Sequence, residues 1–233
     1  MSSMKPTGIL YLVSTPIGNL EDMSMRAIRI LKEVQVVAAE DTRRTGLLLH
    51  HFGIENRLES YHDFNKETKG AVLIRRLVSG ESIAVVSDAG TPGISDPAFN
   101  LVRSAIQNAI PVVPIPGPTA AIAALTVSGL PTDRFVFEGF LPVKKGRKSR
   151  LENLSAETRS VVLYESPHRL LRTLNDLREK LGDRRMAVCR EMTKKFEDVR
   201  RGSLSEMIAH FSKNPVKGEF VLVIQGCSNK DKP

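Results

Sequence analysis

The stretch Ile83–Pro97, IAVVSDAGTPGISDP, decides how this chain folds. Its first four residues are apolar, and they stop abruptly at a run of small and turn-forming residues. The pattern predicts a buried strand that ends in a loop, whose glycines let a ligand lie against bare backbone. An ordinary tight turn is the alternative, but two Gly, two Pro and two Asp within Ser87–Pro97 favour a ligand loop.

Two other segments repeat this design. They are Ile9–Asp22, ILYLVSTPIGNLED, and Val112–Leu125, VVPIPGPTAAIAAL. Three strand-then-loop units indicate one ligand site at the carboxyl ends of a mostly parallel sheet. The loops lack the GxGxxG spacing of dinucleotide-binding proteins, and the chain has no GxxxxGK[ST] sequence, which argues against a P-loop kinase or ATPase.

The order of predicted elements gives the fold class, which is α/β. Strands and helices alternate in the first half, and the strands are continuously apolar, so we expect a sheet covered on both faces. The segment Pro114–Pro118 holds three prolines and cannot continue as a regular element. We therefore expect an N-terminal α/β domain of residues 1–117 and a C-terminal α/β domain of residues 118–233, with a mixed sheet in the second.

The charge balance indicates a polyanionic partner. The chain of 233 residues has a formal net charge of +8, and neutralising phosphates with such charge releases counterions. A basic enzyme without a nucleic-acid partner explains the charge equally well. The run Lys144–Arg150, KKGRKSR, adds to the case, because a phosphate-contacting loop after a strand suits it better than a solvated surface run.

Compartment and metal use follow from what the sequence lacks. No apolar run approaches the roughly 20 residues that span a membrane, and the first residues do not resemble a signal peptide, so we expect a cytoplasmic protein. Cys189 and Cys227 have no metal-ligand spacing, and we expect buried thiols and no metal.

Polar clusters also follow predicted strands elsewhere. Ala38–Thr45, AAEDTRRT, Tyr164–Arg169, YESPHR, and Cys189–Lys195, CREMTKK, are such clusters. For Asp41, Arg43 and Arg44 a site role and a capping or solvated role have equal weight. No His forms an obvious pair with a Ser or Cys nucleophile, so a hydrolase triad finds no support.

Eight motifs in this order resemble a known family: STPIGNLED, AAEDTRRT, SDAGTPGISDP, PIPGPTAAIAAL, FEGFLP, YESPHRL, CREMTK and GEFVLVI. Each motif is moderately specific, and the ordered set is highly specific. Over Gly8–Gly226 the chain resembles the ribosomal RNA ribose 2'-O-methyltransferases of the tetrapyrrole methylase superfamily. The resemblance implies two α/β domains with S-adenosylmethionine in the cleft between them, and methylation of a cytidine in the decoding region of 16S rRNA.

The resemblance also implies which residues contact the cofactor. The wider superfamily has a GGDP loop, and the matching positions here depart from it at Ala89 and Thr91. The change at Thr91 removes a carboxylate, although Asp88 is near enough to substitute. The implied cofactor contacts are Ile17, Asp88, Ala89, Gly90, Thr91, Pro92, Ile94, Thr119, Ala120, Tyr164, Cys189 and Glu219.

A ribose hydroxyl is a weak acid, so methyl transfer to it calls for a general base or a cation that stabilises developing charge. The sequence does not single out one such group. The catalytic candidates are Asp41, Glu165, Glu191 and Lys194. The candidates for RNA contact are Arg43, Arg44, Lys144, Lys145, Arg147, Lys148 and Arg150.

Two other functions stay open at this stage. A methylase of a tetrapyrrole or another small molecule is one, and the basic run Lys144–Arg150 counts against it. A non-catalytic RNA-binding module that aids ribosome assembly is the other, and it needs no cofactor pocket. The resemblance implies a homodimer acting on 16S rRNA of the 30S subunit, and the sequence does not separate free rRNA from the assembled subunit.

Overall fold

The computed structural model describes residues 6–227, and the chain forms two compact units that divide between Thr119 and Ala120. Each unit has one sheet of five strands. The sequence placed the boundary just before this point, after Gly117. Within residues 6–227 no helix is both long enough and apolar enough to cross a membrane.

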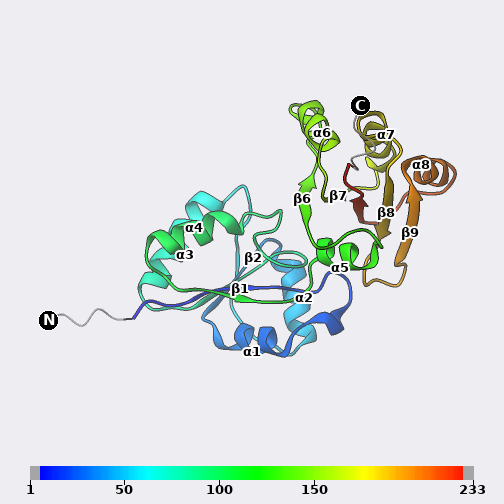
Figure 1. Ribbon diagram of the computed structural model, residues 1–233. Coiled ribbons are helices and arrows are strands. Elements are labelled where there is room, and N and C mark those ends of the chain that lie inside the picture. Colours follow the sequence, from blue (N-terminus) through cyan, green and yellow to red (C-terminus); the bar gives the residue numbers. More distant parts are fainter. Residues whose placement is uncertain (1–5, 228–233) are drawn as a thin grey trace. The chain divides into compact units, whose positions relative to one another are not determined.

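Unit 1 contains a parallel sheet, as the sequence predicted. Its strands run in the order β3-β2-β4-β1-β5, and every neighbouring pair is parallel. Figure 1 labels β1 and β2 together with helices α1 to α4 of this unit. The elements in chain order are β1 (Leu10–Val13), the 3-10 helix η1 (Leu20–Asp22), α1 (Met25–Glu33), β2 (Val36–Ala39), α2 (Thr42–His51), β3 (Leu58–Ser60), α3 (Lys66–Val78), β4 (Ile83–Val86), α4 (Ala98–Gln107) and β5 (Val112–Ile115).

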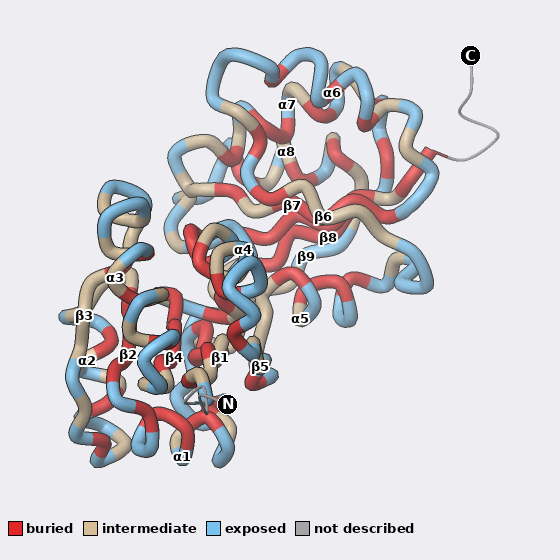
Figure 2. Tube along the Cα trace, turned by 90° about the vertical axis from the view of Figure 1, so that its left-hand side faces the viewer, coloured by how far each residue is buried: buried red, intermediate tan, exposed pale blue. Residues whose placement is uncertain are grey.

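Helices cover both faces of this sheet, and every side chain of β2 and β4 is therefore buried. On one face, Leu31 of α1 and Leu49 of α2 pack against Val37 and Val86. On the other face, helices α3 and α4 pack through Leu73, Leu77 and Leu101. Figure 2 shows these strands as buried segments.

The topology of unit 1 has a switch point at the carboxyl ends of two strands. Strands β1 and β4 are neighbours, yet α1, which follows β1, and α4, which follows β4, lie on opposite faces. Ligands in such sheets bind outside the carboxyl ends of two strands with this relation. The residues that follow these strands are Ser14 and Ser87.

Unit 2 contains the mixed sheet that the sequence predicted. Its strands run in the order β6-β7-β10-β8-β9, in which β6 and β7 are parallel and the other pairs antiparallel. The elements are α5 (Ala120–Val127), β6 (Phe135–Phe140), α6 (Arg147–Ser155), β7 (Ser160–Glu165), α7 (Leu170–Leu181), β8 (Arg185–Arg190), β9 (Asp198–Ser203), α8 (Leu204–Lys213) and β10 (Phe220–Ile224).

One face of the second sheet packs against three helices and carries the core of unit 2. Leu154 of α6, Leu174 of α7 and Phe211 of α8 pack there against strand residues such as Leu163 and Leu222. Helix α5 touches the strands β7 and β10. It is built of small apolar residues, which lets its backbone lie close to its neighbours.

The basic run was predicted as a loop, and this prediction is wrong for its second half. Gly146 adopts a left-handed φ of 83° and begins α6, so Arg147, Lys148 and Arg150 are helical. The helix was not predicted because the buried side chain of this run is an arginine, Arg147, rather than an apolar residue. Lys144 and Lys145 stay outside the helix and are exposed.

Candidate active site

The loops after β1 and β4 are joined by their backbones at the switch point of unit 1. Thr15 N donates to Gly90 O at 2.9 Å, and Gly90 N donates back to Thr15 O at 3.0 Å. Gly90 has a φ of 82°, a conformation that a glycine adopts without strain. The two loops that the sequence placed at one site are therefore fixed to each other.

A chain of hydroxyl groups, Ser14, Thr91 and Thr119, brings in the loop after β5. Ser14 Oγ donates to Thr91 Oγ1 at 3.0 Å, and Thr91 Oγ1 lies 2.7 Å from Thr119 Oγ1. Thr91 Oγ1 also lies 3.2 Å from the carbonyl oxygen of Pro118, to which it can donate. Thr91, the position where a carboxylate was expected from the wider superfamily, thus links all three loops without adding charge.

Gly117 makes this close approach of the loops possible. A Cβ atom on Gly117 would lie 2.7 Å from Cβ of Ser14, which is closer than side chains tolerate. Bare backbone at Gly90 and Gly93, in the loop after β4, was the feature from which the sequence indicated a ligand. The structure adds that Gly117 approaches a residue of another loop.

Asp88, the expected substitute for the missing carboxylate, is held by the end of β2. Its carboxylate accepts from Asp41 N at 2.9 Å and pairs with Arg44 at 3.4 Å. Neighbouring Glu40 has a raised pKa, first because it is partly buried and then because Asp88 is negatively charged. Asp88 therefore lies at the expected strand edge, with part of its hydrogen-bonding capacity already in use.

The other cofactor candidates of unit 1 differ in exposure. Ile17 and Pro92 are buried, whereas Ala89 and Ile94 are exposed. The exposed Ile94 precedes Ser95, which has a φ of 65°. An apolar side chain presented by a polar loop suits contact with an apolar part of a ligand.

Two cofactor candidates of unit 2, Tyr164 and Cys189, lie in one row of the sheet. Both are paired with Val221 of β10, and both reach helix α5. Ala121 N donates to Tyr164 Oη at 3.3 Å, and Cys189 Sγ lies 3.9 Å from Ala124 O. Burial raises the pKa of Tyr164, and it raises the pKa of the Cys189 thiol to about 12.

Cys189 is expected to resist alkylation in the folded protein, because its side chain is buried and its thiolate is almost absent below pH 9. Treatment with iodoacetamide at pH 8, followed by peptide mass spectrometry, should leave Cys189 unmodified. The control is the same treatment in about 8 M urea, a concentration that unfolds most domains, and it should modify Cys189. Rapid modification of Cys189 without denaturant would contradict this burial.

Two catalytic candidates have surroundings that do not suit proton abstraction. Asp41 caps α2 and binds Arg43, and hydrogen bonds from Arg43 lower its pKa to about 2, which makes it a weak base. The Glu165 side chain is 0% exposed and accepts from Thr173 Oγ1 at 2.6 Å. We therefore withdraw Glu165 as a catalytic candidate, since a fully buried carboxylate does not reach a substrate hydroxyl.

Glu191 and Lys194 form a cluster with Glu219 in a strained turn. Lys194 Nζ lies 3.0 Å from Glu191 Oε1 and 2.9 Å from Glu219 Oε2. Burial alone lowers the pKa of Lys194, but the two carboxylates outweigh it and raise that pKa. Burial raises the pKa of Glu191, but hydrogen bonds from Glu219 N and Lys194 lower it overall. Lys194 is thus a cation held in place.

Sequence reasoning missed what shapes this turn. Glu191 and Thr193 have left-handed φ values of 50° and 67°, which is unusual for residues other than glycine. A Cβ on Gly218 would lie 2.6 Å from Cγ of Glu191, so Gly218 makes room for the Glu191 side chain. The sequence signal for this contact was the glycine just before Glu219.

The candidates for RNA contact separate into one buried residue, Arg147, and six exposed ones. Arg147 is withdrawn from this group, because its side chain is 6% exposed and binds Asp176 at 2.7 Å. The other ion pairs join Arg43 to Asp41, Arg44 to Asp88, Lys148 to Glu152 and Arg150 to Glu138. Lys144 and Lys145 are exposed and have the fewest contacts that would compete with RNA.

In the described part of the chain, no group of three or more His, Cys, Asp or Glu residues is arranged to hold a metal ion.

Comparison with solved structures shows the fold. The chain is similar to a diphthine synthase, with a TM-score of 0.73 and 15% identity over 94% of this chain and 90% of that one. It is also similar to the uroporphyrin-III C-methyl transferase of Thermus thermophilus solved with S-adenyl homocysteine. That match has a TM-score of 0.66 and 21% identity, and covers 94% of this chain and 97% of the other.

Comparison of sequences gives the family. The chain is 54% identical to the ribosomal RNA small subunit methyltransferase I of Synechocystis over 97% of its own length and 82% of the relative's. It is 50% identical to the Bacillus subtilis protein of the same name, over 96% and 77% of the two lengths. Residues 9–208 match the family model described as Tetrapyrrole (Corrin/Porphyrin) Methylases. The chain therefore belongs to the tetrapyrrole methylase family and, within it, to the group of relatives named ribosomal RNA small subunit methyltransferase I.

Proposed function

We propose that this chain is an S-adenosylmethionine-dependent methyltransferase that methylates the ribose 2'-hydroxyl of a cytidine in the decoding region of 16S rRNA. The observation that carries the proposal is the 54% identity to a ribosomal RNA small subunit methyltransferase I over nearly the whole chain. The site supports it, because the loops at the switch point of unit 1 combine bare backbone at Gly90 with the hydroxyls of Ser14, Thr91 and Thr119.

The residues of unit 1 fit the cofactor chemically. S-adenosylmethionine supplies a methyl group made electrophilic by the sulfonium charge. The hydroxyl chain and the carbonyl of Pro118 offer hydrogen bonds without adding an unpaired cation, which would repel a sulfonium. These loops would bind and orient the cofactor, and orientation supplies much of the rate of such a transfer.

Lys194 is the catalytic candidate whose surroundings best suit the chemistry. Its ammonium is held between Glu191 and Glu219, stays charged, and is 28% exposed. A fixed cation of this kind stabilises the negative charge that grows on the ribose oxygen while the hydroxyl proton passes to solvent water. Glu191 and Glu219 act in this proposal as positioning residues for Lys194.

Three substrates separate the proposed function from its alternatives. We expect labelled methyl transfer from S-adenosylmethionine to 30S subunits lacking the modification, with the label on a cytidine 2'-oxygen in the decoding region. Transfer to a precorrin and not to RNA would favour the small-molecule methylase. Binding of 30S subunits without cofactor binding or transfer would favour the assembly module. A parallel assay on free 16S rRNA identifies which form of the RNA is the substrate.

The wider setting of this activity is part of the proposal. The family resemblance supports the 30S subunit as the substrate and a homodimeric state. We also propose a cytoplasmic location, which agrees with relatives that are named for ribosomal RNA. That the two units are separate domains is supported by the sheet and apolar core that each one has.

A further inference from the structure

Three consecutive backbone carbonyls in unit 2 are each bound by an arginine. The carbonyl of Leu141 accepts from Arg169, that of Pro142 from Arg147 at 3.2 Å, and that of Val143 from Arg172 at 3.4 Å. These residues lie between β6 and α6 in a segment without regular structure. We call the arginines Arg147, Arg169 and Arg172 the arginine clamp.

Two buried side chains, Glu165 and Thr173, and the partly exposed Asp176 hold the clamp in turn. Glu165, with no exposed side-chain surface, pairs with Arg169 at 3.2 Å. Asp176 accepts from Arg147 Nε at 2.7 Å, and Thr173 Oγ1 joins the two parts by accepting from Arg147 and donating to Glu165. A network of this kind, in which each buried charge has partners, keeps its members in one arrangement.

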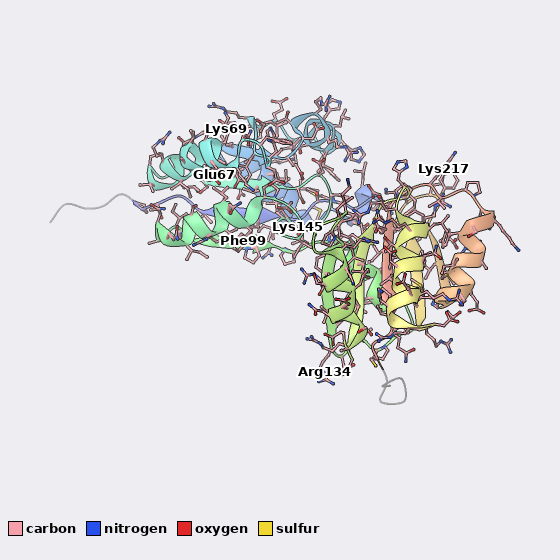
Figure 3. All side chains as sticks on the ribbon, turned by 90° about the horizontal axis from the view of Figure 1, so that it is seen from above. Glu67, Lys69, Phe99, Arg134, Lys145 and Lys217 are labelled. Atoms are coloured by element: carbon pink, nitrogen blue, oxygen red, sulfur yellow. The ribbon has the colours of Figure 1, made fainter. Side chains whose placement is uncertain are left out.

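The clamp ends where two exposed lysines begin. Lys144 and Lys145 follow Val143 directly, and Arg147 N donates to Lys144 O at 3.2 Å. Gly146, between them and the helix, has a left-handed φ of 83°, which glycine adopts without strain. Figure 3 labels Lys145 on this segment beside the start of α6. The lysine turn, Lys144–Gly146, is thus fixed at both ends.

We infer that the arginine clamp is a positioning device that presets the lysine turn for contact with the phosphates of the rRNA substrate. The inference rests on the proposed function and adds the residues that organise substrate binding. A preset backbone lowers the entropy that two long side chains lose on binding RNA. Arg147 acts only through the turn, because its guanidinium is buried and fully engaged with Asp176, Thr173 and Pro142.

The test compares Arg147→Lys with Arg178→Lys, an exposed arginine on the same helix α7 as the anchors Thr173 and Asp176. For Arg147→Lys we expect the KM for 30S subunits to rise about fivefold with kcat and cofactor affinity unchanged, since only ordering of the turn is lost. The slope of log affinity against log salt should stay the same. In the double variant Lys144→Ala/Lys145→Ala that slope should fall by about one for each lysine.

The KM and the salt slope test the arginine clamp, whereas methyl transfer by the wild-type protein tests the proposed function. If wild-type protein methylates 30S subunits but Arg147→Lys keeps the wild-type KM, the clamp has no positioning role. A lower salt slope in a further variant, Arg147→Gln, which removes the charge that Arg147→Lys keeps, would make Arg147 itself a phosphate contact, and this also overturns the inference. Should Arg147→Lys fail to fold, Asp176→Asn weakens the same anchor and is expected to raise KM in the same way. If wild-type protein transfers no methyl group to 30S subunits, the proposed function fails first.

Discussion

Gly117→Ala is expected to weaken S-adenosylmethionine binding by at least about tenfold, as misplaced binding groups commonly do. The new Cβ would lie 2.7 Å from Cβ of Ser14, so the loop after β5 must move away from the loop after β1. Ser14 begins the hydroxyl chain, so the hydrogen bond to Thr91 at 3.0 Å would lengthen or break. Isothermal titration calorimetry with the cofactor measures the loss directly.

The same substitution at Gly46 is a matched control. Gly46 lies inside α2, and its Cβ would meet only Leu58 Cδ1, at an ordinary distance of 3.6 Å. Alanine there should raise stability by about 0.5–1 kcal/mol, because glycine is a poor helix residue. Gly46→Ala is therefore expected to bind the cofactor as wild type and to melt at a higher temperature.

Gly93→Ala separates backbone strain from crowding. Gly93 has a φ of 92° within the same loop as Thr91, but no atom lies within 4 Å of its Cβ position. We expect Gly93→Ala to lower the melting temperature while weakening the cofactor less than Gly117→Ala does. Equal cofactor affinity in Gly117→Ala and wild type would show that the approach of Gly117 to Ser14 does not shape the site.

The sequence predicted the strands of unit 1 that precede polar loops, for a physical reason. Strands β2, β4 and β5 are apolar runs that stop at polar or turn-forming residues, so their ends are visible in the sequence. Strand β3 went unpredicted, because Leu58–Ser60 is short, mostly polar and only partly buried at the sheet edge. A sequence shows the pattern of apolar residues, and this pattern predicted most of the strands. It does not show which strands pair with each other, so an edge strand with few apolar residues was missed.

The candidate site was predictable in its location and not in its contacts. The three loops were foreseen because each follows a strand, and parallel strands end at the same edge. The role of Thr91 depends on Ser14 and Thr119, which are far from it in sequence. The burial of Glu165 and Arg147 was hidden for the same reason, since ionised side chains are usually exposed and their partners Thr173 and Asp176 lie on another element.

Lys194→Met is expected to lower kcat by about 100-fold or more, the loss that follows removal of one group that stabilises developing charge. Cofactor affinity should change little, and the melting temperature should fall only slightly, because Lys194 is partly exposed. Single-turnover methyl transfer to 30S subunits measures the chemical step, and calorimetry measures cofactor binding.

Glu165→Gln is expected to lower stability and to leave kcat almost unchanged, the opposite of Lys194→Met. Glutamine keeps the shape of the side chain but removes the charge that faces Arg169, and breaking a buried pair in this way costs about 3–5 kcal/mol at most. The variant should melt earlier, yet each folded molecule should transfer methyl groups at close to the wild-type kcat. A kcat loss in Glu165→Gln as large as in Lys194→Met, with the fold intact, would restore Glu165 as a catalytic residue. It would also mean that the loop bound by Arg169 opens during the reaction, because only then does the buried carboxylate meet the substrate.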